Sequence, residues 1–586
     1  MSEFEQRRQR ALAAAAGLPF TTLAAGDPES PRIDRAAARL ISPQLSRFLD
    51  GLVIGRTPAG LRLALTRADG AAAARRLVEA ASGVRVAETL VAPAHRIHAE
   101  HERLFGRRES LRRGRGDPAP RPSRTQATPR PASREPVTLE APPERGLPTV
   151  VLKLLLLGGI GFLVWLLYLV QEVLWQQGRR PDTQLEHAVA LLGYAWALPV
   201  LPSLFALVGF VLYRKPSYRR RVLEPIDTLV SFRIVARGEN AFRLRSTIES
   251  IRGELERLPL FPYVIEVVTD LPVDLGNGDE LAHFVVAGDY RTGRGARFKA
   301  RALAYAMERS TLPDEAWILH LDEESHLTPS VVVGVYDAVR EEEASGEHRV
   351  GQGAILYHRD LAKRPFLTLA DSIRTGDDVG RFYFQHRLGV TIFGLHGSFI
   401  LVRSDVEREV GFDFGPEGSI TEDSFWALEQ MQLQRRCRWV DGYVAEQAPQ
   451  SVNDFVKQRR RWFVGLAKVV TEAPVALRWR IPLAISTAVW SASWVGILYL
   501  YVNLFTGFAV PDWVQLCGNV GFATYIATYV LGLHLNLENL PAQGRLRSAV
   551  LYAAQIALIP VFAALEAAGV IYGLVRAETG FHVIRK

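Results

Sequence analysis

Apolar residues gather in two parts of the chain and leave a long stretch of mixed composition between them. Two apolar runs, at 150–170 and 188–213, precede that stretch, and three more, at 481–505, 514–535 and 548–575, follow it. Each run is long enough for a helix to cross about 30 Å of hydrocarbon, because a helix rises about 1.5 Å per residue. The pattern predicts an integral membrane protein that carries a large soluble domain between its membrane helices.

Short apolar runs alternate with helical patterns between residues 225 and 475, which predicts an α/β domain with a mainly parallel sheet. The strand-like runs include TLVSFRIVA (228–236), YVIEVVTD (263–270) and EAWILHLD (315–322). Ligands of such sheets bind at the carboxyl ends of the strands. Polar residues stand at these three ends: Arg237-Gly238-Glu239, Asp270, and Asp322-Glu323-Glu324.

The first 106 residues have a different pattern, in which Ala-rich helical stretches alternate with short strand-like runs such as GLVIG and LRLALTR. This predicts a small α/β module. Arg and Pro dominate the next stretch, 107–148. Because such a composition buries too little apolar surface to fold, we expect 107–148 to be a disordered linker.

The net charge of +8 is unevenly distributed, with basic clusters at 103–134 and in YRKPSYRRR (213–221). No nucleic-acid-binding motif accompanies these clusters, so we expect membrane lipid and no nucleic acid as the partner. The positive-inside rule places 1–149 and the chain after 214 in the cytosol. The N-terminal MSEFEQRRQR is too polar for a signal peptide, so the first membrane helix would direct insertion.

The number and spacing of the cysteines exclude two kinds of structural feature. Only Cys437 and Cys517 are present, far apart in the sequence. They offer neither a disulfide framework nor a thiolate metal site, which is consistent with soluble parts in a reducing cytosol.

Carboxylates at two strand ends are the first candidates for chemistry. Asp322 and Glu324 are spaced so that both can reach one divalent cation and leave its other positions to water and phosphate oxygens. A polar turn would explain the same pair equally well. Asp270 could contact a nucleotide, but an isolated Asp after a strand is as often a turn former.

Two later motifs are open to two interpretations in the same way. In QRRRW (458–462), Gln458, Arg461 and Trp462 could bind a diphosphate and a sugar ring, or the arginines could only anchor the next membrane helix. In SITED (419–423), Ser419 or Thr421 can cap a helix whose first turn carries Glu422 and Asp423. Those acids could serve the helix dipole or carry chemistry.

The order of the motifs is more specific than any one of them. A strand-end Asp, then DEE (322–324), TED (421–423) and QRRRW directly before a membrane helix is similar to the membrane-bound inverting glycosyltransferases of family 2. The resemblance covers about 225–475 and implies a GT-A (Rossmann-like) domain. The sequence most resembles egghead-type β-1,4-mannosyltransferases, in segments such as FRIVARGEN (232–240) and FGLHGSFILVR (393–403).

The resemblance implies a role for each motif. Asp270 would contact the nucleotide, and Asp322 with Glu324 would hold Mg²⁺ or Mn²⁺, with Glu324 standing where many members have Asp. Asp423 would be the general base, which requires desolvation or a nearby acid, because a helix N-terminus lowers a carboxyl pKa. The remaining candidates are substrate contacts: Glu239, Lys299, Glu422, Gln458, Arg461 and Trp462. For Lys299 or Arg301 the alternative is a solvated cation, which is the usual state of a cation on an amphipathic helix.

The resemblance also sets the expected function. We expect an inverting enzyme of the bacterial inner membrane that moves mannose from GDP-mannose, a nucleotide-sugar donor, to a lipid or glycan acceptor. One alternative is a UDP-glucose-dependent processive polysaccharide synthase with export, and another is a non-catalytic nucleotide-binding receptor. The terminal FHVIRK (581–586) is expected near the cytosolic site, although three full membrane helices would put it outside.

The N-terminal module has a resemblance of its own. Its run ARLISPQLSRFLDGLVIGR (38–56) is similar to the N-terminal domain of type II secretion ATPases. Some such domains bind cyclic di-GMP through an opening motif that is only partly present here. The module would therefore bind cyclic di-GMP, or serve only in folding or docking.

Overall fold

The computed structural model divides the 586-residue chain into two compact units, residues 1–120 and 121–586. The structure describes residues 33–38, 51–65, 71–82, 84–92, 126–140, 147–175, 180–216, 220–508, 510–540 and 544–576, with Ala14, Leu18, Pro19, Leu40 and Ile97.

The first unit contains a small three-stranded sheet. Strand β2 (Gly60–Leu65) lies in the middle, antiparallel to β1 (Gly51–Thr57) and parallel to β3 (Val86–Val91). Helices α2 (Arg35–Ala38) and α4 (Ala71–Ser82) accompany the sheet, and Val53, Leu63 and Val78 belong to one buried apolar cluster.

The second unit is built on a seven-stranded sheet with the order β12-β10-β11-β9-β6-β7-β8. Strands β9, β6, β7 and β8 are parallel neighbours, whereas β11 is antiparallel to both β9 and β10. The strands are β6 (Val230–Ala236), β7 (Tyr263–Thr269), β8 (Leu281–Val285), β9 (Trp317–Asp322), β10 (Val350–Leu356), β11 (Ile400–Arg403) and β12 (Cys437–Ala445). This confirms the α/β fold with a mainly parallel sheet.

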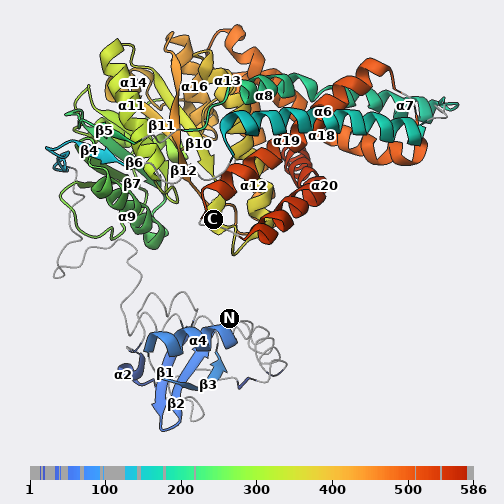
Figure 1. Ribbon diagram of the computed structural model, residues 1–586. Coiled ribbons are helices and arrows are strands. Elements are labelled where there is room, and N and C mark those ends of the chain that lie inside the picture. The colour runs from blue at the N-terminus through green and yellow to red at the C-terminus, as the bar shows by residue number, and fades with distance from the viewer. Residues whose placement is uncertain are drawn as a thin grey trace. The chain divides into compact units, whose positions relative to one another are not determined.

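Helices cover both faces of this sheet, which is why its strands are apolar on both sides. Phe232 packs in one apolar cluster with α9 and α11, and Val235 packs in another with α10 and α16 (Figure 1). The helices are α9 (Ala241–Arg257), α10 (Phe298–Arg309), α11 (Pro329–Ser345), α12 (Pro365–Asp377), α14 (Ser404–Val410), α16 (Glu422–Gln432) and α17 (Val452–Glu472). Shorter segments are η2 (His358–Asp360), η3 (Asp378–Phe382), α13 (Tyr383–Arg387) and α15 (Gly415–Gly418).

One ion-pair network is buried in this domain. Arg233 on β6 lies 2.7 Å from a Glu266 oxygen and 2.5 Å from a Glu407 oxygen, and all three side chains are at most 4% exposed. The pairing links the sheet to α14. Burial alone would raise the pKa of Glu407, but Arg233 and His320 hold it down to about 2.

Replacing Arg233 with Met is expected to destabilise the domain by about 3–5 kcal/mol, because two carboxylates stay buried without their cation. The unfolding midpoint of the full chain in urea and detergent measures this. Arg245→Met is the control, since Arg245 pairs with Asp274 where the two side chains are 44% and 82% exposed. Equal midpoints for the two variants would contradict the role given to Arg233.

Part of the predicted disordered linker, residues 126–140, has a defined structure. Strand β4 (Val137–Leu139) pairs with β5 (Arg221–Leu223), and Arg130 bridges to Tyr263 at the start of β7. Backbone hydrogen bonds hold this segment, and Leu139 is only 5% exposed. The prediction of disorder is therefore wrong for 126–140, while 107–125 and 141–146 lie outside the described residues.

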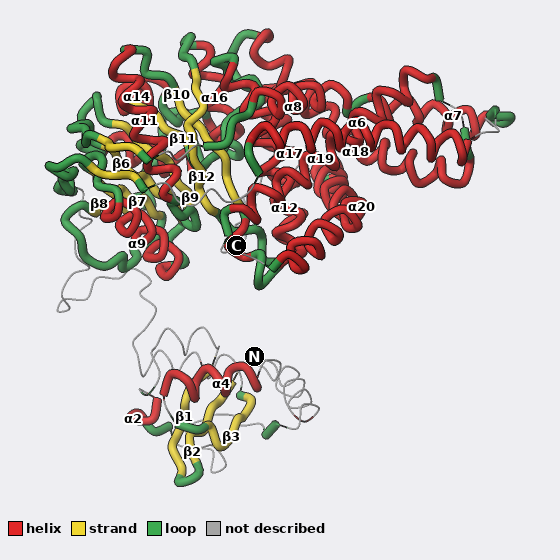
Figure 2. The backbone as a smooth tube through the Cα atoms, viewed as in Figure 1, coloured by secondary structure: helices red, strands yellow, loops and turns green. Residues whose placement is uncertain are grey.

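The five predicted apolar runs form helices long and apolar enough to cross a membrane. They are α6 (Thr149–Trp175), the segment α7 (Gln184–Leu192), η1 (Gly193–Ala197) and α8 (Val200–Leu212), then α18 (Leu477–Thr506), α19 (Asp512–Glu538) and α20 (Arg545–Val575). Figure 2 shows these long helices on one side of the second unit, and the strands with the helices that cover them on the other. Leu154 and Val173 on α6 are 67% and 71% exposed, as expected of side chains that face lipid.

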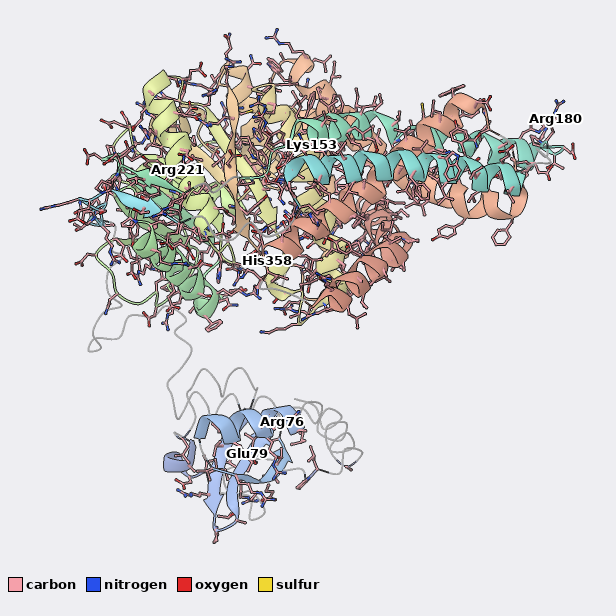
Figure 3. The ribbon with its side chains drawn as sticks, in the orientation of Figure 1. Arg76, Glu79, Lys153, Arg180, Arg221 and His358 are labelled. Carbon is pink, nitrogen blue, oxygen red and sulfur yellow. The ribbon has the colours of Figure 1, made fainter. Side chains whose placement is uncertain are left out.

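Contacts between helix ends show which ends share a side. The Lys153 ammonium donates to the carbonyl of Val211 at 2.5 Å, and Lys215 pairs with Glu538 at 2.6 Å. The start of α6 and the ends of α8 and α19 therefore lie together. Figure 3 shows Lys153 at the sheet-domain end of these helices and Arg180 at the far end, in agreement with the charge-based topology.

The end of α20 also lies against the sheet-bearing domain. Arg460 on α17 donates two hydrogen bonds, of 3.0 and 2.7 Å, to the carbonyl of Arg576, the last described residue. Near the other end of α20, the Tyr552 hydroxyl lies 2.8 Å from a ring nitrogen of His534, close to the end of α19. Both ends of α20 therefore lie on the side of the sheet-bearing domain, so the position of Arg576 agrees with the expectation of a C-terminus near the cytosolic site. FHVIRK itself lies outside the described residues.

Candidate active site

The parallel arrangement brings the predicted strand-end acids to one edge of the sheet. Strand β6 lies between β7 and β9, so Asp270 after β7 and Asp322 at the end of β9 share that edge. Both line a cavity of about 910 Å³. Glu239 does not line this cavity: its carboxylate lies 3.3 Å from Arg237, which does, and both side chains are half-exposed. The expected substrate contact of Glu239 is therefore not supported by its position.

Three carboxylates meet in the cavity that Asp270 also lines. Ligand atoms of Asp322, Glu324 and Glu446 all lie within 4.8 Å of one another. Carboxylate oxygens are the ligands that Mg²⁺ and Mn²⁺ prefer, so the donor set fits the expected cation. The hydroxyls of Ser325 and Ser398 donate to Glu446 and orient it.

Glu446 is a site residue that the sequence interpretation missed. It directly follows β12, whose end is fixed next to β9 by the bridge between His326 and Ala445. A signal was present, because GYVAE is an apolar run that ends in an acid, as the runs before Asp270 and Asp322 do.

Lys299 links this cluster to the TED acids. From the first turn of α10, its ammonium donates to Asp322 at 2.5 Å and to the Gly397 carbonyl at 2.6 Å, and lies 3.8 Å from Glu422. Nearby acids hold the pKa of Lys299 above its ordinary value although burial opposes this. The structure therefore favours the site position of Lys299 over that of a solvated cation, and Arg301 pairs with Asp270 at 2.5 Å.

The acids of TED open helix α16 without the predicted side-chain cap. Thr421 occupies the N-cap position but makes no capping hydrogen bond, and Ser419 accepts from the Arg297 amide and donates to the Gly415 carbonyl. Asp423 Oδ1 accepts the Ser424 amide at 2.7 Å. Capping by Ser419 or Thr421 is therefore a wrong prediction.

Burial changes the acidity of both TED carboxyls. It raises the pKa of Asp423, and burial together with the adjacent Asp423 raises the pKa of Glu422, while Lys299 opposes both shifts. This desolvation is the effect that a base at a helix N-terminus requires.

The backbone of Gly397 faces these groups. A Cβ added there would lie 3.1 Å from the Lys299 ammonium nitrogen, 3.2 Å from Asp423 Oδ2 and 3.6 Å from Glu422 Oε1. The glycine therefore keeps the space between the cation and the two acids free of a side chain.

Replacing Gly397 with Ala is expected to reduce sugar transfer by about tenfold, because the added Cβ would displace the Lys299 ammonium and Asp423, and a misplacement of about 1 Å costs about 10²-fold. Initial rates with detergent-solubilised protein measure the loss. Gly253→Ala is the control, since nothing lies within 4 Å of a Cβ at that helical position. A Gly397→Ala enzyme as active as Gly253→Ala would contradict this packing argument.

The QRRRW motif lies on α17, and Gln458, Arg461 and Trp462 all line the cavity. Their spacing puts them on neighbouring turns of one helix face. Burial lowers the pKa of Arg461, and Glu422, Asp322 and Asp423 oppose this, so the guanidinium lies in the field of the acids. The Gln458 side-chain oxygen accepts from Arg459 at 2.9 Å.

Arg459 has a different environment from Arg461. Its guanidinium lies 2.6 Å from Asp371 on α12 and 2.6 Å from Glu566 on α20, and the side chain is 2% exposed. Arg459 therefore links α17 to α12 and α20 through ion pairs. Its position fits neither of the two roles considered for the arginines of this motif, membrane anchor and diphosphate ligand.

The same cavity continues between the membrane helices. Its far part is lined largely by apolar and small residues, including Trp196, Pro202, Trp490, Gly496, Phe522 and Ala563. One end of the cavity thus carries carboxylates and arginines, and the other suits an apolar ligand.

The chain is similar to several known proteins. Residues 317–536 match the family model described as glycosyl transferase family group 2. The β-1,4-mannosyltransferase bre-3 of Caenorhabditis briggsae is 29% identical over 419 residues, covering 68% of this chain and 91% of the relative. The β-1,4-mannosyltransferase egh of Drosophila melanogaster is 31% identical over 402 residues, covering 68% and 87%.

A solved structure, the mannosyltransferase PcManGT from Pyrobaculum calidifontis in complex with GDP-Man and Mn²⁺, has 14% identity and a TM-score of 0.37, covering 66% of this chain and 98% of that one. The sequence relatives are closer and extend over most of their own length. The chain belongs to the family of group 2 glycosyltransferases that includes the egh and bre-3 β-1,4-mannosyltransferases.

Proposed function

We propose that this protein transfers mannose from GDP-mannose, with inversion, to a hydroxyl of a lipid-linked acceptor at the cytosolic face of a membrane. The observation that carries the proposal is the meeting of Lys299, Glu422 and Asp423 around Gly397, beside the cluster of Asp322, Glu324 and Glu446. The names of the relatives support mannose as the sugar.

The chain's own groups supply the steps of an inverting displacement. Asp423 Oδ2 takes the acceptor proton, since Oδ1 is held by the Ser424 amide. The acceptor oxygen bonds to the anomeric carbon as the bond from that carbon to the diphosphate breaks. Lys299 and Arg461 stabilise the negative charge that builds up on the leaving diphosphate. Mg²⁺ or Mn²⁺, held by the three carboxylates, would supply further charge stabilisation there.

The apolar part of the cavity supports a lipid-linked acceptor. A lipid chain could lie among Trp196, Trp490 and Phe522 while its head reaches the acids. A polymer leaving between the membrane helices is the alternative, and it would also occupy this space.

A sugar-nucleotide screen with product sizing tests the proposal. Membranes that contain the full chain receive labelled GDP-mannose or UDP-glucose, and the products are separated into organic-soluble lipid and water-soluble polymer. Label from GDP-mannose in the lipid fraction is the expected result. A water-soluble polymer made from UDP-glucose would replace the proposal with the processive synthase, and no label from either donor would favour the receptor.

Two further expectations remain proposals. The relatives named above are animal proteins, so they do not support the expected bacterial inner membrane; membrane association itself follows from the five apolar helices. Cyclic di-GMP as a ligand of the N-terminal module rests on sequence resemblance alone, and most of the module's first 32 residues lie outside the described residues.

A further inference from the structure

Trp462 lies in a column in which aromatic rings and guanidinium groups alternate. The guanidinium carbons of Arg374 and Arg459 are each 4.5 Å from the Trp462 ring centroid. Beyond them, Arg374 is 4.6 Å from the Tyr357 ring and Arg459 is 4.1 Å from the Phe455 ring. Cation–π contacts at these distances hold the indole and both guanidinium groups in fixed planes.

The two arginines of this column differ in ion pairing. Arg459 has two carboxylate partners, Asp371 and Glu566, at 2.6 Å each. Among the residues that the structure describes, Arg374 forms no ion pair, and its buried Nη1 has no hydrogen-bond partner. The carboxylates of Asp371 and Glu446 act on Arg374 without forming an ion pair with it, and they hold its pKa above the ordinary value although burial opposes this. They leave the buried Nη1 without a hydrogen bond, which is costly and which an anion in the cavity would supply.

Arg374 reaches the substrate cavity from another part of the chain than the known motif. It stands on α12, whereas Arg461 and Trp462 stand on α17, and all three line the same cavity. Arg374 and Arg461 thus present two cations to one space. A planar guanidinium with free N–H groups suits the oxygens of a phosphate.

We propose that Arg374 is a phosphate-binding residue of this cavity, held in plane by Tyr357 and Trp462. The inference rests on the proposed function, because it assigns the phosphate to one of that reaction's substrates. The phosphate belongs either to the nucleoside diphosphate of the donor or to a phosphorylated lipid acceptor.

Binding to the purified full chain in detergent tests the proposal without any need for turnover. GDP with Mg²⁺, guanosine and a short-chain prenyl phosphate are titrated against the wild type, Arg374→Gln and Arg374→Lys. The matched control is Arg381→Gln, because Arg381 lines the same cavity and lies 5.2 and 5.1 Å from the Phe382 and Phe393 rings, but is already paired with Asp377 at 2.5 Å.

Arg374→Gln is expected to lower the affinity for one of the two phosphate ligands by about tenfold or more, as the loss of a charge-assisted hydrogen bond does. Arg374→Lys should keep part of the affinity, and Arg381→Gln should keep nearly all of it. Weaker GDP binding with unchanged guanosine binding identifies the donor diphosphate. Weaker prenyl phosphate binding with unchanged GDP binding identifies the acceptor.

Unchanged binding of both phosphate ligands by Arg374→Gln would overturn the proposal. If Arg374→Gln folds poorly, Arg374→Lys serves as the test. Loss of both guanosine binding and GDP binding in Arg374→Lys would show that Arg374 has a structural role only. Failure of the proposed function is a separate result. A wild type that binds UDP and not GDP would disprove the donor, and the same comparison would then be made with UDP.

Discussion

Replacing Asp423 with Asn reduces sugar transfer by about 10³-fold, within the range typical of the loss of a positioned general base. The amide keeps the size of the side chain but cannot accept the acceptor proton. Because Asp423 does not belong to the carboxylate cluster that would hold the cation, GDP binding should be unchanged. Initial rates and GDP titration on the same preparation measure both quantities.

Glu422→Gln is the matched comparison for this effect. It removes the neighbouring carboxylate on the same helix turn, and we expect a loss of about tenfold, since Glu422 Oε1 lies farther than Asp423 Oδ2 from the Cβ position of Gly397, 3.6 Å against 3.2 Å, and faces Lys299 at 3.8 Å. A larger loss for Glu422→Gln than for Asp423→Asn would reverse the two assignments. Equal rates for the wild type and Asp423→Asn would defeat the catalytic interpretation altogether.

Removal of the divalent cation is expected to abolish transfer, and Asp322→Asn to reduce it by about 10²-fold or more, because several kcal/mol of charge stabilisation would depend on the ion. Glu446→Gln should raise the Mn²⁺ concentration that gives half-maximal activity by about tenfold. Metal titration after chelation measures both effects.

Glu323→Gln is the control for the cation site. Glu323 stands between Asp322 and Glu324 in the sequence, but its carboxylate faces Arg243 at 3.9 Å and it is not part of the three-carboxylate cluster. Its metal dependence should match the wild type. If Glu446→Gln also matched the wild type, Glu446 would not be a ligand.

The features that depend on local sequence pattern could be predicted from the sequence. Alternating strands and helices predicted the sheet, and a polar residue after a buried strand correctly brought Asp270 and Asp322 to one edge. The same rule failed for Glu239, because the chain turns after β6 and pairs that carboxylate with Arg237. Strand-end position indicates an edge of the sheet but does not give the direction of a side chain.

The features that the sequence did not reveal depend on contacts between distant segments. Glu446 joins Asp322 only because β12 pairs with β10 and bridges to His326. Arg374 lies on an ordinary amphipathic helix, and only the packing of α12 against α17 shows that its Nη1 is buried without a hydrogen-bond partner within the described residues. The ordered segment 126–140 was missed because its composition is polar, while backbone pairing of β4 with β5 needs few apolar side chains.

The anomeric configuration of the new linkage tests the central claim most directly. The proposed role of Asp423 as the base for the acceptor hydroxyl implies a single displacement, so the α-linked mannose of GDP-mannose should become β-linked in the product. The one-bond coupling between the anomeric carbon and its hydrogen, measured by NMR on the purified product, reports the configuration. A β-linkage is the predicted result, and an α-linkage would contradict the role assigned to Asp423.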